Sequence, residues 1–248
     1  MADNGTTDDK QRWAGETAIS PGLGIFRGHS GDNRPHRHWA HQISIGLDRE
    51  VVFDIEGKEV CAPAVLIAAG TRHRQHNGET LSLYIDPLVN VDIPVTLDTK
   101  QSKWKALADN EAQVLVSRFP REKSLQDTLQ QIALPEPLTL VDNQRLAAVI
   151  AKIQASTQGN NNISRDELAA LCRLSPSRFS HWFSEQTGLP LRSYRKWLRL
   201  ITALEIALTT TNLSQAATEA GFSDQAHFTR AVREAFGISP TQLMKLLA

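Results

Sequence analysis

This sequence has little cysteine, no long apolar run and no excess of either charge. Its 248 residues include two cysteines, Cys61 and Cys172, each among apolar neighbours in a different half of the chain. We therefore expect buried free thiols in a reducing compartment rather than a disulfide framework. No stretch approaches the roughly 18 apolar residues of a membrane-spanning helix, and the polar N-terminus has no signal-peptide core. These absences predict a cytoplasmic protein with no membrane partner.

The formal charge is also balanced, with 27 Lys and Arg against 27 Asp and Glu. This balance by itself argues against a strongly basic surface for nucleic acid. From Val141 onward, however, 12 basic residues stand against 8 acidic ones, a net of +4, which leaves 15 against 19, a net of −4, in the preceding part. A mildly basic C-terminal part is suited to binding DNA. The length of the chain is enough for two domains.

The N-terminal part reads as a β structure. Residues 1–17 are polar and we expect a mobile tail there. Short apolar runs separated by turn residues then predict strands at 43–47, 51–55, 65–68 and 81–85. Several strands at this spacing indicate a small antiparallel barrel or sandwich.

Six of the eight histidines lie between His29 and His76. His36 and His38 are two apart, hence on one face of an extended segment, and Gln42 is four positions further. His73 follows Gly70 by three positions and precedes Asn77 by four.

This spacing resembles the two metal motifs of the cupin fold, Gly…His-x-His-x3-Glu and Pro-x-Gly-x2-His-x3-Asn. Gln42 stands in place of the glutamate and Ala68 in place of the proline. His36, His38 and His73 with water could hold Zn²⁺ or Fe²⁺, whereas a metal-free pocket for a small molecule is favoured because the anionic ligand is missing. The candidate ligand-binding residues are His36, His38, Trp39, Gln42, Arg72 and His73.

The pattern becomes helical after Lys100. Trp104, Leu107, Ala108, Ala112, Leu115 and Phe119 recur at intervals of three and four, as do Leu125, Leu129 and Ile132. These two helices are expected to pack on the barrel, and either to form a dimer seam or only to complete the core. Pro135 and Pro137 then indicate an extended linker at 134–140, before a helix capped by Asp142.

The last third of the chain contains two copies of one helical pattern. Ser164 with Glu167 is a capping box, Leu168, Leu171 and Leu174 form a buried side, and Ser175-Pro176 opens a second helix. The second copy runs from Ser214 to Pro240, with Ser175 matched to Ser223 and Gly188 to Gly237. Each copy has the outline of a helix-turn-helix. A continuous helix at 191–208, about 27 Å long, separates them and could place two recognition helices in successive major grooves.

Apolar residues of each second helix belong to the core and leave a polar set near its N-terminal end to face outward, where a recognition helix reads base edges. Gln225 could bond adenine, and Arg230 guanine or a phosphate. The candidate base-contacting residues are Ser177, Arg178, Ser180, His181, Gln225, Ala226, His227, Thr229 and Arg230. The candidate phosphate contacts are Arg192, Lys196, Arg199 and Arg233.

The block from Asp142 to Met244 resembles the DNA-binding domain of the AraC/XylS family of bacterial transcription regulators. Gly221-Phe222-Ser-Asp-Gln-Ala-His-Phe228-Thr-Arg230 and Phe236-Gly237-Ile-Ser239-Pro240 are close to the family signature. Departures are His181 where the first recognition helix often has Arg, Leu189-Pro190-Leu191 after Gly188, and Leu243-Met244 for the usual Tyr-Arg. The N-terminal half is similar to the family's cupin-like sensor and dimerisation domain.

The resemblance implies an α+β multidomain protein: a cupin-like β-barrel with following helices at 18–133, a linker at 134–140 and an all-α domain with two helix-turn-helix motifs at 141–248. It implies a regulator, more often an activator, that binds double-stranded DNA, a small-molecule effector and RNA polymerase, and that can form a homodimer. We expect no catalytic activity. The alternative is a cupin-type metalloenzyme, a dioxygenase or isomerase, tethered to a helical domain.

Overall fold

The computed structural model describes residues 13–20, 22–90, 95, 102–131, 136–137, 144–158, 163–210 and 212–247. Contacts group the chain into two compact units, Met1–Pro135 with Arg233–Ala248, and Glu136–Val232. The final 16 residues are thus grouped with the first unit. Most of the expected linker at 134–140, together with Asp142 and Ile132, lies outside the described residues, and the expected domain boundaries stay a prediction.

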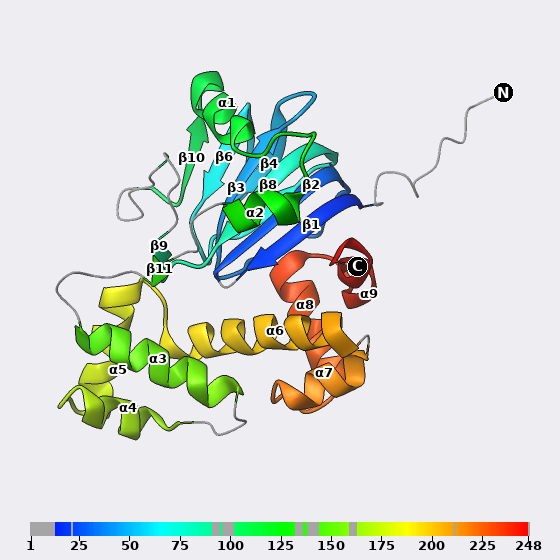
Figure 1. Ribbon diagram of the computed structural model, residues 1–248. Coiled ribbons are helices and arrows are strands. Elements are labelled where there is room, and N and C mark those ends of the chain that lie inside the picture. The colour runs from blue at the N-terminus through cyan, green and yellow to red at the C-terminus, as the bar shows by residue number, and fades with distance from the viewer. Residues whose placement is uncertain are drawn as a thin grey trace. The chain divides into compact units, whose positions relative to one another are not determined.

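The first unit is built on two antiparallel sheets (Figure 1). The larger has the order β1-β2-β8-β3-β6-β10 and the smaller β5-β4-β7. The strands of these sheets are β1 (Ala14–Ser20), β2 (Leu23–Ser30), β3 (His41–Gly46), β4 (Val51–Ile55), β5 (Lys58–Ala62), β6 (Ala64–Ile67), β7 (His73–Gln75), β8 (Gly78–Ile85) and β10 (Trp104–Leu107). The two-residue strand β9 (Val89–Asn90) also belongs to the first unit, and the two-residue strand β11 (Glu136–Pro137) belongs to the second. The strands paired in these two sheets do not close into a single barrel, which corrects the expected barrel to a two-sheet arrangement. β1 also begins inside the stretch 1–17 that the polar composition predicts to be a tail.

One face of the larger sheet is apolar and is covered by two helices. Ile43 and Ile45 of β3 and Leu81 and Leu83 of β8 point to this face, because alternate residues of a strand share a side. Helices α1 (Asp109–Ser117) and α2 (Leu125–Gln131) cover it, and their buried side chains join the same core cluster. The packing of both helices on the sheet is as predicted. The first helix begins later than the periodicity suggests, since Trp104–Leu107 is strand β10, paired with β6.

The opposite face of the larger sheet is apolar at one end and polar at the other. Val65 and Ile67 of β6 pack with Phe53 and Ile55 of β4, which closes the apolar end between the two sheets. Further along the same face, Gln42 and Ser44 of β3 lie beside Ser82 of β8, and all three are buried. The polar end is where the predicted ligand-binding histidines lie.

The C-terminal segment covers a third region of this unit. Ile238 and Leu246 are buried against Phe26 of β2, with Trp13 and Tyr84 packed around them. Helix α9 (Pro240–Leu247) contacts β1, and Thr17 Oγ1 donates a hydrogen bond to the Leu246 carbonyl. Burial of these side chains explains why the chain after Arg233 belongs to the first unit.

The second unit is helical. It contains α3 (Gln144–Gln158), α4 (Arg165–Leu171), α5 (Pro176–Thr187), α6 (Leu191–Thr210), α7 (Leu213–Glu219) and the first two turns of α8 (Gln225–Phe236). In Figure 1, α6 runs lengthwise from the side of α3 and α5 toward α7, and it packs on all three. The 20 residues of α6 give it a length of about 30 Å, so the predicted long helix is confirmed.

Both cysteines are free, as expected, but only Cys172 is buried. Cys61 is exposed on β5 and its thiol donates to Glu50 Oε2 at 2.9 Å, which corrects the expectation that both thiols are buried. Among the described residues no helix combines the length and apolarity needed to cross a bilayer.

Candidate functional site: a buried histidine cluster and two exposed helix N-termini

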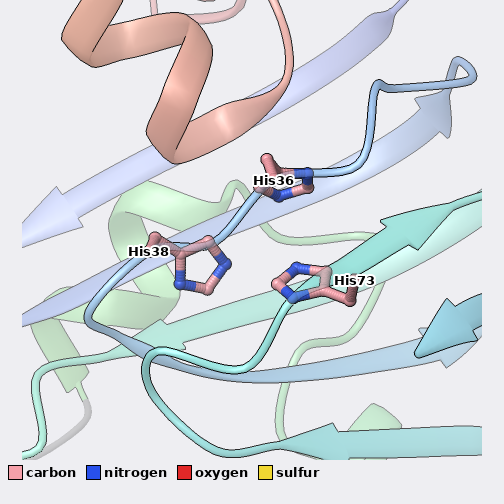
Figure 2. Close-up of side chains that lie close together, drawn as sticks. All are labelled: His36, His38 and His73. Atoms are coloured by element: carbon pink, nitrogen blue, oxygen red, sulfur yellow. The ribbon is translucent and has the colours of Figure 1, made fainter. Parts of the chain in front are cut away.

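Three histidines from two adjacent segments meet between the sheets of the first unit. His36 lies on an extended segment beside β7, and its N–H donates to the His73 carbonyl at 2.9 Å while the His73 N–H donates to the His36 carbonyl at 3.0 Å. His38 follows two positions later. The three side chains are 2–6% exposed, and Figure 2 shows their rings turned toward a common space.

Backbone carbonyl groups fix which ring nitrogen carries the proton. Nδ1 of His36, His38 and His73 lies 2.9, 3.0 and 2.9 Å from the carbonyl oxygens of Arg34, Ala40 and Thr71. A carbonyl oxygen only accepts hydrogen bonds, so each Nδ1 must donate. In a neutral imidazole with Nδ1 protonated, Nε2 presents a lone pair.

Burial keeps these imidazoles neutral. Loss of hydration is the largest cause that lowers the pKa of His36 to about 3, with the neighbouring His38 as the next cause. Burial likewise lowers the pKa of His38, and it lowers that of His73 well below its ordinary value. Near neutral pH the cluster therefore presents nitrogen lone pairs rather than positive charge.

Gln42 lies at the centre of the cluster. Its Oε1 is 2.9 Å from His38 Nε2 and 3.0 Å from His73 Nε2. On its other side, Gln42 Nε2 donates to Ser44 Oγ at 2.9 Å and to Gln75 Oε1 at 3.2 Å. The amide thus joins the histidines to a buried polar network.

The rest of this network was not predicted. Ser44 Oγ is 2.8 Å from Ser82 Oγ, and Gln75 Nε2 donates to Ser30 Oγ at 2.8 Å. Thr80 also bonds Ser30. The signal was present in the sequence as polar–apolar alternation, Gln42-Ile-Ser44-Ile and Thr80-Leu-Ser82-Leu. The short apolar runs predict strands here but do not tell which face turns inward, and the polar side faces the protein interior and not water.

Three residues expected near the histidines do not join the buried cluster. Arg72 is exposed, although it lies next to His73 in sequence. Trp39 is half-buried, and its ring lies against Gly70, where an added Cβ would be 2.6 Å from the indole. Asn77 is also half-buried, and its backbone is bonded to Asp32 and Arg49.

A second group of possible ligand atoms lies at the surface of the smaller sheet. Side chains of Asp54, Glu59 and His76 bring one such atom each within 4.8 Å of the others. His76 Nε2 is 3.1 Å from Asp54 Oδ2, and Arg74 also pairs with Asp54. Asp54 thus makes ordinary surface contacts with His76 and Arg74.

The first helix-turn-helix forms as predicted, with one exception. Ser164 accepts from the Glu167 N–H and the Glu167 side chain bonds back, so the capping box is present. Ser175 caps α5 with Pro176 at its first turn. Leu168 is buried, but Leu171 is 53% exposed and Leu174 half-buried, because Cys172 turns inward in place of Leu171.

The second helix-turn-helix repeats the same turn with one more residue. The Leu174 N–H donates to Ala169 O at 3.0 Å, and the Phe222 N–H donates to Ala217 O at 2.9 Å. The helix cap is then Asp224, which accepts from the His227 N–H at 2.6 Å. Ser175 therefore corresponds to Asp224, not to Ser223, and His181 corresponds to Arg230.

The predicted base-contacting side chains lie on the outer side of α5 and α8. Apolar neighbours, Phe179 and Phe183 in α5 and Phe228 and Val232 in α8, are fully buried. Of the nine candidates, Ser180 and Thr229 are half-buried and the other seven are exposed: Ser177, Arg178, His181, Gln225, Ala226, His227 and Arg230. Gln225 Oε1 accepts from Ser214 Oγ at 2.7 Å, so this amide is held beside α7.

The predicted phosphate contacts are spread over two helices. Arg192 and Lys196 are exposed on the first turns of α6, and Arg199 is half-buried one turn on. Arg233 is exposed on α8. Arg195 is directed elsewhere, since its guanidinium donates to the Ile163 carbonyl at 2.7 Å.

Comparison with known sequences agrees with this arrangement. Residues 168–245 match the family model described as a helix-turn-helix domain. The chain is 28% identical to the probable transcriptional regulator LumQ of Photobacterium leiognathi over 225 residues. The aligned region covers 84% of this chain and 90% of LumQ. It is 38% identical over 71 residues to the arabinose operon regulatory protein of Escherichia coli, covering 28% of this chain and 24% of that protein. Against the transcriptional activator RhrA of Rhizobium meliloti, identity is 28% over 109 residues, or 43% of this chain and 34% of RhrA.

Comparison with solved structures shows a fold that is shared over most of the chain. An apo variant of ToxT from Vibrio cholerae aligns with a TM-score of 0.62 at 11% identity, covering 94% of this chain and 100% of ToxT. Wild-type ToxT bound to an unsaturated fatty acid gives 0.60 at 9% identity, with 93% and 98% covered. The shared fold is a β-rich N-terminal part with a helical C-terminal part. The chain carries an AraC-type helix-turn-helix domain and is homologous to the AraC-family transcriptional regulators.

Proposed function

We propose that this protein is a sequence-specific DNA-binding transcriptional regulator, an activator controlled by a small molecule that binds at the buried histidine cluster of its first unit. The observation that carries the proposal is the doubled helix-turn-helix. Two recognition helices have the same capped start and the same buried side, and both leave polar side chains exposed near the N-terminal end. The homologues favour a regulator over the alternative, a metalloenzyme.

The two helices should contribute unequally to base recognition. Arg230 on α8 has a flexible, permanently charged guanidinium that can bond guanine in bidentate fashion. The corresponding residue of α5 is His181, which is shorter and has fewer donors. Gln225 can bond adenine once DNA replaces its bond from Ser214. We assign Ser177, Arg178, Ser180, Ala226, His227 and Thr229 to the same surface.

Phosphate contacts should come from Arg192, Lys196, Arg199 and Arg233. They carry no sequence information but fix the register of the protein on the duplex. Their number matters because each neutralised phosphate releases counterions, which makes binding weaken with salt.

The effector site is proposed to include His36, His38, Gln42 and His73, with Trp39 and Arg72 at its edge. Buried polar side chains in a largely apolar setting are typical of ligand sites. ToxT, which shares the fold, has been solved with a bound fatty acid. For the present chain we infer only that a small molecule binds at this histidine cluster.

Activation would require contact with RNA polymerase, and the protein would act in the cytoplasm.

A homodimer is supported by α1, where the apolar side chain of Val114 is 48% exposed. Sedimentation velocity of the Val114→Asp variant tests this seam: a dimer in the wild type should become a monomer, and an unchanged mass would exclude α1 from the interface.

The DNA-binding proposal is tested by selecting fragments from genomic DNA with the purified full chain, followed by fluorescence anisotropy on the selected site. Arg230→Ala should weaken sequence-specific binding by about 1–3 kcal/mol, and His181→Ala by less. Lys196→Ala should reduce the salt slope by about one without changing sequence preference.

The matched control is Lys58→Ala, which removes an exposed positive charge next to the turn before β5 in the first unit. Its affinity should equal that of the wild type. If no fragment is enriched, or if Arg230→Ala binds as tightly as the wild type, the proposed recognition surface is wrong.

A further inference from the structure

We propose that a hydrogen-bond relay from Asp224 through Ser223 fixes the tautomer of His227, and thereby the kind of base that α8 reads. His227 then accepts a hydrogen bond from the exocyclic amino group of cytosine or adenine in the major groove. The choice of base rests on the proposed DNA-binding function, whereas the tautomer is a property of the free protein. Ser223 and Asp224 act through His227 and are positioning residues.

The three side chains meet at the turn that opens α8. Asp224 Oδ1 accepts a hydrogen bond from the His227 N–H at 2.6 Å, which is the helix cap. Ser223 Oγ is 3.1 Å from Asp224 Oδ2 and 3.2 Å from His227 Nδ1. The hydroxyl therefore lies between the second oxygen of the capping carboxylate and one nitrogen of the imidazole ring.

The hydroxyl of Ser223 has a single hydrogen, so it donates to one of these two neighbours. Hydrogen bonds from the His227 N–H and then from the Ser223 hydroxyl lower the pKa of Asp224, so near neutral pH its oxygens carry no proton and only accept. A hydrogen bond to a charged oxygen is roughly twice as strong as one between neutral groups, which directs the hydrogen to Asp224. The Ser223 oxygen is left to accept, and His227 Nδ1 must donate to it.

A second contact holds the imidazole in this orientation. Its ring meets the buried ring of Phe222 edge to face, with 5.1 Å between centroids and 78° between planes. His227 is otherwise exposed. Nε2 lies across the ring from the nitrogen that is bonded to Ser223, and in a neutral ring with Nδ1 protonated it carries a lone pair.

This lone pair gives α8 an acceptor beside a donor. Arg230, three positions further on the same side of the helix, offers only donors. In the major groove the amino groups of cytosine N4 and adenine N6 are donors, whereas guanine presents N7 and O6 and thymine presents O4, all of them acceptors. His227 should therefore favour cytosine or adenine, and the opposite tautomer would favour guanine or thymine.

The tautomer is measured on the free full chain by nitrogen-15 NMR of the histidine side chains, at about pH 8, where a histidine is ordinarily neutral. We expect the His227 signals, identified by their loss in His227→Gln, to show the proton mainly on Nδ1. Ser223→Ala removes the acceptor of Nδ1, and the proton should then move to Nε2, the form that free histidine prefers. Ser223 is exposed and is not the cap, so this variant should fold, which far-UV circular dichroism checks.

Asp224→Asn should reverse the tautomer without loss of the helix cap. Its amide oxygen keeps the bond from the His227 N–H, so its amide nitrogen takes the place of Oδ2 and donates to Ser223 Oγ. The hydroxyl hydrogen is then free to donate to His227 Nδ1, which leaves the proton of the ring on Nε2. A merely structural role of Asp224 would not move this proton.

Base preference is measured by selection of bound sites from random DNA. At one position the wild type should favour cytosine or adenine by roughly three- to tenfold, the value of one hydrogen bond. Asp224→Asn should lose this preference or turn it toward guanine or thymine. Ser214→Ala is the matched control, because the Ser214 hydroxyl is bonded to Gln225 instead, at 2.7 Å. It should keep both the His227 tautomer and the preference at that position.

A proton mainly on Nε2 in the wild type would overturn the proposal, and so would one tautomer common to the wild type, Ser223→Ala and Asp224→Asn. These results do not depend on DNA. A reversed tautomer with an unchanged base preference in Asp224→Asn would overturn the assignment of His227 to an amino group. A wild type that has the expected tautomer but selects no DNA sequence would confirm the relay and refute the proposed regulator.

Discussion

Arg173 and Gly221 occupy the same position in the turns of the two helix-turn-helix motifs, and both have positive φ, 53° and 79°. Each lies directly before the residue whose N–H closes the turn. The left-handed conformation is thus required by the turn and not by the residue type. Glycine adopts it freely, whereas arginine adopts it at a penalty.

This pair gives a matched prediction on stability. Gly221→Ala should lower the free energy of unfolding by about 1 kcal/mol, because alanine at positive φ is strained. Arg173→Ala should change it by less than about 0.5 kcal/mol, since the wild-type residue is already a strained, exposed non-glycine. Urea unfolding followed by circular dichroism measures both. Equal losses in the two variants would contradict the prediction that only the glycine substitution introduces left-handed strain.

The helix caps predict a second pair of effects. Ser175→Ala should destabilise the chain by about 1 kcal/mol, because the Arg178 N–H loses its acceptor at the start of α5. Ser177→Ala, two residues later, removes no cap and should be nearly neutral for stability while still affecting DNA binding. The capping interpretation is contradicted if Ser177→Ala is the more destabilising variant in urea unfolding.

In the second motif the cap is a carboxylate. The backbone hydrogen bond from His227, followed by the Ser223 hydroxyl, lowers the pKa of Asp224. Asp224→Asn keeps the acceptor and should preserve α8, whereas Asp224→Ala should let its first turn fray and weaken DNA binding. Hydrogen exchange at the His227 amide distinguishes the two, and equal protection in both variants would exclude the cap.

Asp86 predicts a dependence of stability on pH. Burial raises its pKa to about 6, against the smaller opposite effect of the Leu88 N–H that donates to it. Its folded form therefore holds a proton more tightly than its unfolded form. The stability of the wild type relative to Asp86→Asn should be greatest below about pH 4, fall as the pH rises toward 6 and level off above that, by at most about 3 kcal/mol. Urea midpoints of the two proteins across this range measure it, and a constant difference would show that Asp86 titrates normally.

Much of the helical part could be predicted from the sequence because its signals are local. Ser164 with Glu167 and Ser175 with Pro176 mark helix starts within a few residues, and the structure has both. Leu171 was assigned to the wrong side because α4 ends there, so the helical period no longer applies to the next residues. The extra residue before Asp224 was missed since Ser223 is an equally good cap by composition.

The sheet region was less predictable because its determinants are not local. β1 and β2 pair over their full length, yet Gly15, Gly24 and Gly28 weaken the strand pattern in sequence. Trp104–Leu107 fits a helical spacing, but these residues form a strand because they pair with β6, which is distant in the chain. The histidine cluster was found from spacing alone. Gln75 and the serines beside it were not, since their function depends on which face of the strand turns inward.

Gly237 and Gly188 end the two recognition helices in the same left-handed conformation, with φ of 72° and 69°, but their surroundings differ. A Cβ added to Gly188 meets nothing within 4 Å, whereas one on Gly237 would lie 2.7 Å from the Arg34 carbonyl oxygen and 3.0 Å from Asn33 Cβ. In the first unit the Arg34 N–H also donates to the Gly237 carbonyl, and the Arg37 N–H to that of Glu234. This close approach ties the segment that carries His36 to the end of α8.

Gly188→Ala should therefore show only the penalty of a left-handed alanine, about 1 kcal/mol. Gly237→Ala should be more destabilising by about 1–3 kcal/mol, because a backbone carbonyl cannot move aside without displacing the segment of Asn33 to Arg37. It should also raise hydrogen exchange in α9, which begins three residues after Gly237, while Gly188→Ala leaves α9 protected. Equal unfolding free energies and equal α9 exchange in the two variants would show that the end of α8 is not held against Arg34 in solution.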